Sequence, residues 1–363
     1  MKDEKYYSDA GRDERLRSEL IALFRGFGYD RYRMAKFESY DVYLKNKDYI
    51  DGDSIVTFTD SKGRLLALRP DVTLSIVNNL PGDGVQKKYY YDESVFRRDK
   101  RGEYTELRQL GAEYIGGEGM YPECEAVLLA VKSLSFINSD CVLAIGHMDA
   151  VEACLCETGL SPSDYSRARE YIGAKSLHEL KKLLAGCRGE AAERLLALVS
   201  VEGRVSQTVE KAEKLCGGVS SKAIAELKTL VGALEENGFE NKVRLDFSLT
   251  DDVRYYNGVV FRGYVKGSAS AVISGGRYDN MLRRMGKNAR AVGFAVDMTA
   301  AAGRSEEDSV CDTVIVGGSV SPGRLFAEAD RQAALGRRVI AAERDVHGLE
   351  KAHRVFLEDE KKC

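Results

Sequence analysis

Residues 95–113 read VFRRDKRGEYTELRQLGAE, and this stretch says most about the fold. A charged segment, Arg97 to Tyr104, joins two runs rich in strand-forming residues, Lys87 to Phe96 and Glu106 to Ile115. Two such runs around a polar connection predict a pair of antiparallel strands. We therefore expect these two runs to form a pair of strands joined by the charged segment.

The second strand of this hairpin carries polar residues on one face. Side chains alternate between the two faces of a strand, so Gln109, Gly111 and Glu113 share one face. A carboxylate and an amide with a glycine between them suit a small polar ligand that carries an amino group. The alternative is an ordinary solvated outer face, which periodicity alone favours.

Three other segments place polar groups inside apolar, strand-like surroundings. They are LRPDVT at Leu68–Thr73, YYNGVVF at Tyr255–Phe261 and SGGRYD at Ser274–Asp279. A cationic amino group pairs naturally with Glu113 and Asp71, since both carboxylates accept charge-assisted hydrogen bonds. The four segments together are candidates for one binding site.

The rest of the chain mixes strands and helices without the βαβ alternation of a doubly wound sheet. A helix is predicted over residues 12–27, a buried helix over 121–135 and a helical block over about 161–240. Further short strands are expected at 55–59, 64–68, 243–247, 255–265, 269–274 and 291–296. The last segment, residues 306–363, reads β-α-β-α. An α+β fold follows, with a core over residues 1–305 interrupted by the helical insertion.

Composition excludes several classes of protein. The 363 residues are 44% apolar and 31% charged, with 54 basic and 57 acidic side chains and a formal charge of −3. No apolar run of about 18 residues is present, so we expect no membrane segment, and no secretory signal is visible at the N-terminus. A soluble, cytoplasmic protein is expected.

Known site motifs are also missing. The eight cysteines and four histidines show no metal-ligand spacing, so we expect reduced thiols and no metal. The sequence contains no GxGxxG after a strand, no P-loop and no GxSxG elbow, and no cofactor is expected.

The four segments, taken in order, resemble the catalytic core of class II aminoacyl-tRNA synthetases, in the histidine–tRNA ligase branch. LRPDVT is similar to the family's LRPE-x-T element, and FRRD with ELRQLGAEYIGG is similar to motif 2. RYYNGVVF and SGGRYDNML resemble the histidine-binding signature and the glycine-rich strand after it. The resemblance covers roughly residues 5–300 and implies an antiparallel sheet flanked by helices.

The departures from this family concern ATP. Where the synthetases have the arginine of Arg-Gly-Leu-Asp-Tyr-Tyr, this chain has Asp251, and an anion there repels the phosphate that a cation would stabilise. Motif 3 should end in Gly-x-Glu-Arg, but Ala300 occupies the arginine position and Thr299 that of the glutamate. Ala35 and Asp99 replace the proline of motif 1 and a glutamate of motif 2. We expect no adenylate chemistry and no catalytic residues.

A pocket without activation machinery resembles the family of ATP phosphoribosyltransferase regulatory subunits, synthetase paralogues of histidine biosynthesis. That resemblance implies a dimer that joins the short-form catalytic subunit in a hetero-oligomer, with histidine as effector. It also implies that residues 306–363 are a truncated anticodon-binding domain, so tRNA is not an expected partner.

Carried over by this resemblance, seven residues would form a histidine pocket. Asp71 and Glu113 would hold the amino group, and Arg97 the carboxylate or a bound anion. Thr73 and Gln109 would complete the polar wall, and Tyr256 and Tyr278 would approach the imidazole ring.

Residues next to this pocket are expected to have mainly structural roles. Tyr255 is expected to pack in the core and Arg277 to pair with Asp279 or another carboxylate. The basic loop from Arg97 to Arg101 is either solvated or a relic of phosphate binding. A divergent histidine–tRNA ligase and a free-standing histidine-binding pseudo-synthetase are the alternative functions.

Overall fold

The computed structural model describes residues 10–47, 49–50, 52–81, 86–98, 102–187, 189–216, 218–250, 255–302, 312–337, 339–346 and 352–357. The chain divides into two compact units. One is Leu16–Gly303, and the other is Arg304–Cys363 with Met1–Arg15. The larger unit contains the predicted site residues.

The larger unit is built on an eight-stranded sheet in the order β1-β5-β6-β11-β10-β9-β7-β8. The five inner pairings, from β5–β6 to β9–β7, are antiparallel, while β1 and β8 pair parallel at the two edges. The strands are β1 (Asp30–Arg31), β5 (Lys87–Arg98), β6 (Tyr104–Ile115), β7 (Cys141–His147), β8 (Val243–Leu245), β9 (Val259–Val265), β10 (Ile273–Arg277) and β11 (Ala291–Asp297). The predicted strand pair is the β5–β6 hairpin, paired over its full length.

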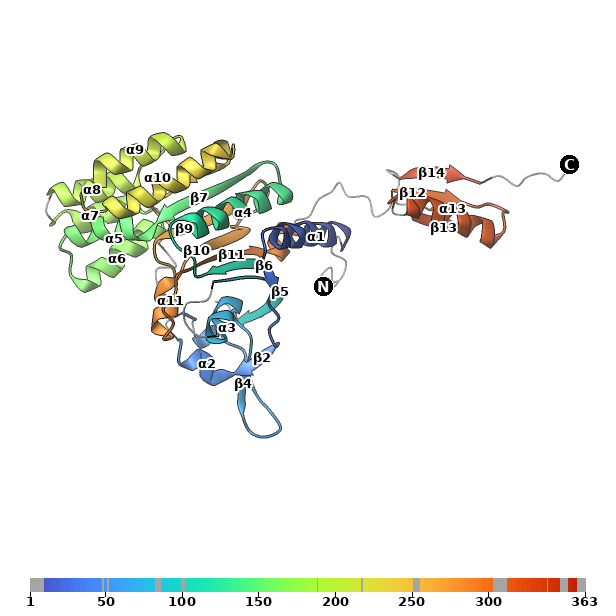
Figure 1. Cartoon of the computed structure of the whole chain (residues 1–363), viewed down its shortest axis with the longest axis horizontal. Helices are drawn as coiled ribbons and strands as arrows, with labels where there is room; N and C mark the ends of the chain where they lie inside the picture. Colours follow the sequence, from blue (N-terminus) through green and yellow to red (C-terminus); the bar gives the residue numbers. More distant parts are fainter. Residues whose placement is uncertain are drawn as a thin grey trace. The chain divides into compact units, whose positions relative to one another are not determined.

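Helices cover both faces of this sheet. On one face, α1 (Ala10–Gly26) and α4 (Tyr121–Ile137) pack on residues such as Leu110, Ala112 and Phe294. On the other face, α3 (Val72–Asn78) packs with Tyr91, Ile115 and Tyr278. Figure 1 shows α4 and α3 on opposite sides of the sheet. The alternation predicted for β6 therefore separates two hydrophobic cores, and Glu113 belongs to the face covered by α3.

A small sheet accompanies α3. Its order is β2-β4-β3, from β2 (Phe37–Ser39), β3 (Thr57–Thr59) and β4 (Leu65–Leu68), with α2 (Tyr40–Leu44) after β2. The β3–β4 hairpin turns at residues 60–63, between the runs expected as strands at 55–59 and 64–68, and Gly63 has a φ of +75°. The hairpin leads through Pro70 into α3, which places Asp71 and Thr73 beside the large sheet.

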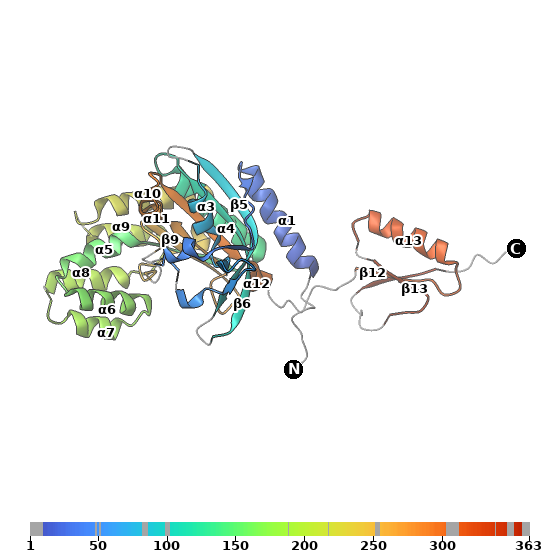
Figure 2. The ribbon, with the colours of Figure 1, turned by 90° about the horizontal axis from the view of Figure 1, so that it is seen from below.

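The helical block predicted at 161–240 is present and packs on the α4 side of the core. It lies as one group of helices beside the sheet in two perpendicular views (Figure 1 and Figure 2). The helices are α6 (Pro162–Gly173), α7 (Leu177–Leu184), α8 (Gly189–Val199), α9 (Val205–Cys216) and α10 (Ser221–Glu236), and α5 (Met148–Glu157) adjoins them. Leu227, Leu230 and Leu234 of α10 are buried in the same core as α4. The insertion is thus part of the larger unit's core.

Two expectations about strands need correction. The strand predicted from Tyr255 begins only at Val259, because Tyr255–Gly258 form a turn with Gly258 at a φ of +71°. The run predicted at 269–274 is shifted, and β10 covers Ile273–Arg277 and is followed by α11 (Asp279–Arg284). Glycines at 275 and 276 hid the second half of this strand, since glycine is uncommon in strands.

The smaller unit also differs from its prediction. It contains β12 (Thr313–Val316), α13 (Pro322–Ala334), β13 (Val339–Ala342) and β14 (His353–Phe356), and its sheet is parallel in the order β13-β12-β14. The second helix expected here is wrong for residues 353–356, which form a third strand; residues 347–351 lie outside the described part. The short HRVF run pairs with the buried β12, a tertiary contact that local sequence does not reveal.

The remaining helix of the larger unit is α12 (Met298–Ala302), directly after β11. In the part of the chain that the structure describes, no helix has the length and apolarity needed to cross a membrane.

Candidate functional site

Glu113 is the centre of the candidate site. It lies on β6, is 2% exposed, and accepts two hydrogen bonds. The Thr73 hydroxyl donates to Oε1 at 2.6 Å, and the Tyr278 hydroxyl donates to Oε2 at 2.7 Å. Residues far apart in the sequence thus meet at one buried carboxyl group.

Asp71 forms the second acidic position. As N-cap of α3, its Oδ1 accepts a hydrogen bond from the Leu74 amide at 2.7 Å. The same oxygen accepts from the Tyr255 hydroxyl at 3.3 Å, and Oδ2 lies 3.6 Å from Nη2 of Arg97. Pro70 precedes the helix, and its carbonyl accepts from Nε of Arg97. The helix cap therefore also fixes the direction of a charged group.

Glycines form the floor beneath Glu113. Gly276, Gly293 and Glu113 are cross-strand neighbours on β10, β11 and β6. A Cβ at Gly293 would overlap the Glu113 carboxylate, and one at Gly276 would lie 2.8 Å from the Tyr256 ring. Gly111 gives the same room to the ring of Tyr91. The glycines are required because the polar and aromatic side chains occupy the space above them.

The two carboxyl groups are electrostatically unusual. Burial raises the pKa of Glu113 to about 8; the hydrogen bonds from Thr73 and Tyr278 lower it in part, and the charge of Asp71 raises it. Burial also raises the pKa of Asp71, opposed mainly by the charge of Arg97. A cationic group placed between them would relieve the cost of ionising both. The arrangement therefore suits a ligand that brings a positive charge.

Tyrosines complete the site on the α3 face. The ring of Tyr255 lies 4.9 Å from that of Tyr256 and 6.2 Å from that of Tyr278, measured between centroids. Tyr49 packs edge-on to Tyr255 at 6.3 Å. Such rings offer flat apolar surfaces and hydroxyl groups to a planar side chain.

The structure brings together most of the residues predicted from sequence. Thr73, Glu113 and Tyr278 are directly hydrogen-bonded, and Asp71 and Arg97 form an ion pair beside them. Tyr256 packs on Tyr255 beside them. Gln109 is half-buried on the Glu113 face of β6, but it lies four residues further along the strand, opposite Glu93 and Asp297.

Two residues of the site were not predicted as part of it. Tyr255 packs against the core of the α3 face, as expected, and its hydroxyl also contacts Asp71. The turn explains this: because β9 starts only at Val259, the strict alternation assumed for Tyr255 and Tyr256 does not hold. Tyr91 was not considered, although it stands opposite Gly111 in the hairpin register, and an aromatic residue facing a glycine was a usable signal.

The positions that differ from the synthetases are only partly described. Ala300 lies in α12, where its amide donates to Oδ1 of Asp297. Its methyl group carries no charge and no hydrogen-bond donor for a phosphate. Asp251, Arg254, Asp99, Lys100 and Arg101 lie outside the described residues. In the described part, no group of three or more His, Cys, Asp or Glu side chains is arranged to hold a metal ion.

Fold and site together define a class II synthetase-like protein with an acidic, tyrosine-lined candidate site. The chain belongs to the histidyl-tRNA synthetase family, whose model matches residues 3–301.

Among curated relatives, the chain is 28% identical over 295 residues to the ATP phosphoribosyltransferase regulatory subunit of Bacillus mycoides, covering 78% of this chain and 70% of the relative. Among solved structures, a regulatory subunit/histidyl-tRNA synthetase from Bacillus halodurans has a TM-score of 0.77 at 24% identity, covering 95% of this chain and 94% of that one. A chain of the ATP phosphoribosyl transferase complex from Thermotoga maritima has a TM-score of 0.62 at 19% identity, covering 79% and 97%. These structural similarities establish the fold.

Proposed function

We propose that this protein is the regulatory subunit of a short-form ATP phosphoribosyltransferase, the enzyme that catalyses the first step of histidine biosynthesis. One observation carries the proposal: the acidic part of the synthetase-like site is present, while positions that the resemblance assigns to ATP carry other residues. Glu113 keeps its Thr73 and Tyr278 partners, whereas Ala300 replaces a phosphate-contacting arginine. The names of the curated relatives support the same assignment.

Histidine is the proposed ligand of the site. Its ammonium group would sit between Glu113 and Asp71, and its carboxylate would face Arg97. Thr73 and Gln109 would complete the polar wall, and Tyr256 and Tyr278 would contact the imidazole ring. The raised pKa of both carboxyl groups supports this assignment, because burial raises each pKa and an ammonium group beside them would lower it again.

The partners follow from the assignment. We infer a hetero-oligomer with the catalytic subunit, supported by the fold shared with a chain of the Thermotoga maritima complex. We also infer a dimer of this chain, supported by apolar side chains left exposed around the small sheet, among them Phe37, Phe58 and Leu65. The complex would work in the cytoplasm and would not need tRNA.

The protein would not be an enzyme by itself. An acidic residue at position 251 would repel the phosphates of ATP, and loss of the positive charge at position 300 would remove transition-state stabilisation. Its contribution would be a coupling free energy between the histidine site and the catalytic subunit, typically about 1–3 kcal/mol.

The test is reconstitution. The short-form catalytic subunit from the same source is assayed alone, with this protein, and with histidine added. We expect activation by this protein, reversal by histidine, and loss of that reversal in Glu113→Ala. Absence of activation would overturn the assignment, and histidine-dependent pyrophosphate exchange by the protein alone would instead support a divergent histidine–tRNA ligase. Histidine binding without activation would point to a free-standing histidine-binding protein.

A further inference from the structure

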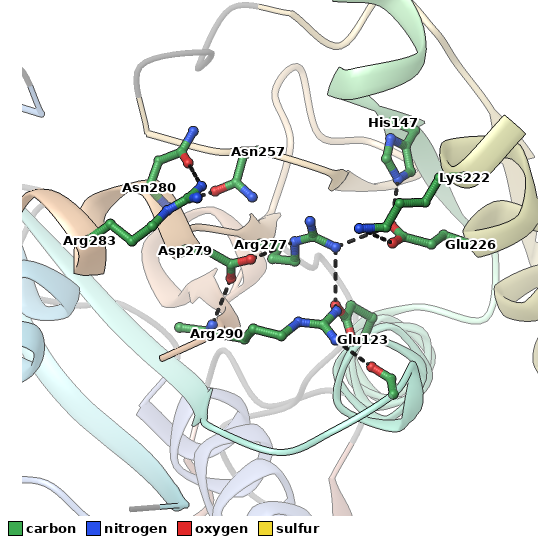
Figure 3. A network of polar contacts seen from close by, with 12 residues as sticks. Glu123, His147, Lys222, Glu226, Asn257, Arg277, Asp279, Asn280, Arg283 and Arg290 are labelled. Carbon is green, nitrogen blue, oxygen red and sulfur yellow. Dashed lines mark hydrogen bonds and ion pairs between the residues drawn. The ribbon is translucent and has the colours of Figure 1, made fainter. Parts of the chain in front are cut away.

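A second buried polar cluster lies on the opposite face of the sheet, around Arg277 at the end of β10 (Figure 3). Its Nη1 lies 3.2 Å from Oε2 of Glu226 and 3.5 Å from Oε1 of Glu123, and its Nε lies 3.0 Å from Oδ2 of Asp279. The Arg277 side chain is 9% exposed. One guanidinium thus contacts carboxylates from α10, α4 and the start of α11. The sequence had suggested only Asp279 or some other carboxylate as partner.

Glu226 is the member that comes from the helical insertion. Besides Arg277, its Oε2 is 3.0 Å from Nε2 of His147, the last residue of β7. Burial would raise the pKa of Glu226, but the hydrogen bond with His147 and the charge of Arg277 bring it below its ordinary value. Glu226 is therefore charged at neutral pH, and α10 is tied to two strands of the sheet by one carboxylate.

Arg277 also supports the turn that carries the site tyrosines. Its guanidinium lies against Gly258: a Cβ there would be 2.9 Å from Cζ of Arg277. The Arg277 carbonyl accepts the Asn257 amide at 2.7 Å, and Oδ1 of Asn257 accepts the Asn280 amide at 3.0 Å. Arg277 therefore holds the turn Tyr255–Gly258 through both its guanidinium and its backbone carbonyl.

The histidine site begins one residue away. Tyr278 follows Arg277, and its hydroxyl contacts Glu113 on the other face of the sheet. The held turn supplies Tyr255, whose hydroxyl contacts Asp71. Tyr278 is thus bonded directly to Arg277, and Tyr255 belongs to the turn that Arg277 contacts. A shift of the guanidinium would reach them through the backbone.

We propose that Arg277 is a positioning residue of the histidine site and that Glu226 couples this site to the helical insertion. The inference rests on the proposed function, whose effector it connects to a second part of the molecule. Coupling free energies are reciprocal, so histidine binding must strengthen the contact of α10 as much as that contact strengthens histidine binding.

The decisive variant is Glu226→Gln, which keeps the shape and removes the charge that faces Arg277. We expect the calorimetric Kd for histidine to rise at least about fivefold, the lower end of common couplings. In the parent protein, histidine should slow hydrogen exchange in α10 as well as in residues 255–258. In Glu226→Gln the slowing in α10 should be lost. Arg277→Lys, which keeps a positive charge, should retain more affinity than Arg277→Gln.

Glu157→Gln is the matched control. It removes the ion pair that Glu157 of α5 forms with Arg194 of α8, a contact between the insertion and the adjoining helix that does not involve the site. Histidine affinity and the slowing of exchange in α10 should both stay as in the parent.

A purely structural role gives a different result. Glu226→Gln would then lower the unfolding midpoint but leave the histidine Kd and the slowing in α10 unchanged, which would overturn the proposal. If the parent binds no histidine, the effector part of the proposed function fails by itself. The positioning role is then judged in the ligand-free protein: exchange at 255–258 must be faster in Glu226→Gln than in Glu157→Gln, and equal rates would refute it.

Discussion

The protonation state of Glu113 decides how the site should respond to pH and to a charged ligand. Its pKa of about 8 means that the ligand-free protein carries a proton there at pH 7. An ammonium group against this carboxyl favours its ionised form, so ligand binding should expel the proton. We predict that histidine binding near pH 7 releases a proton and tightens as the pH rises toward about 8. Calorimetry in buffers of different ionisation enthalpy measures the release, and no buffer dependence would contradict it.

The same residue predicts how stability depends on pH. The pKa of Glu113 is about 8 in the folded protein, above its ordinary value of 4.5, so between these values the folded state binds more protons than the unfolded state. The stabilisation that Glu113 contributes to the folded state is therefore complete below about pH 4.5 and is lost as the pH rises through about 8.

Replacing the group by a neutral amide removes that decline. Glu113→Gln should be more stable than the parent above pH 8, on the order of 1–3 kcal/mol, and similar to it near pH 4.5. Urea unfolding at both pH values tests this. Parallel pH profiles for the two proteins would show that Glu113 ionises normally.

At the scale of elements, α3 joins a helix cap to the binding site. Asp71→Asn keeps a good N-cap and removes the negative charge, whereas Asp71→Ala removes both. We predict a loss of about 1 kcal/mol of stability for the alanine variant and little for the asparagine variant, with weaker histidine binding in both. Thermal unfolding and calorimetry separate the two effects. Unchanged binding by Asp71→Asn would exclude a role of the Asp71 charge in binding.

The glycine floor leads to a second prediction for an element. A methyl group at Gly293 would overlap the Glu113 carboxylate, and β11 cannot shift easily because it is paired on both sides. Gly293→Ala should lose histidine binding and about 1–3 kcal/mol of stability, as overpacked cores do. Gly232→Ala in α10 meets no atom within 4 Å and serves as the control. Equal stability of the two variants would show that a methyl group fits between position 293 and the Glu113 carboxylate.

The sequence predicted elements best where periodicity was strong. The β5–β6 hairpin and the faces of Gln109, Gly111 and Glu113 follow from alternation alone, and the insertion follows from helical spacing. The contact between Tyr255 and Asp71 could not be foreseen, because the start of β9 depends on Gly258 and on the Arg277 side chain beneath it. The ties of Arg277 to Glu226 and Glu123 join segments 51 and 154 positions away, and no local pattern encodes them.

At the scale of the whole molecule, self-association can be tested at the small sheet. Phe58 is 39% exposed and packs edge-on to Phe37, which is 53% exposed. We predict that Phe58→Glu shifts the protein from dimer to monomer in sedimentation experiments, since a charge in an apolar interface is costly. Leu177→Glu, at a similarly exposed site in the insertion, should remain a dimer. A parent protein that is already monomeric would refute the dimer itself.

The two ends of the large sheet have a consequence for the behaviour of the protein at high concentration. The strands at the two edges are short, with two residues in β1 and three in β8. Beyond β1, the edge of β5 is contacted by other segments: the Phe96 amide donates to the Arg69 carbonyl, and Ile55 forms a bridge with Arg97. Open sheets polymerise when a long, flat margin accepts a strand from another molecule. Neither end strand offers the long, flat edge that strand addition needs, so the large sheet favours recognition between copies of the chain through side chains.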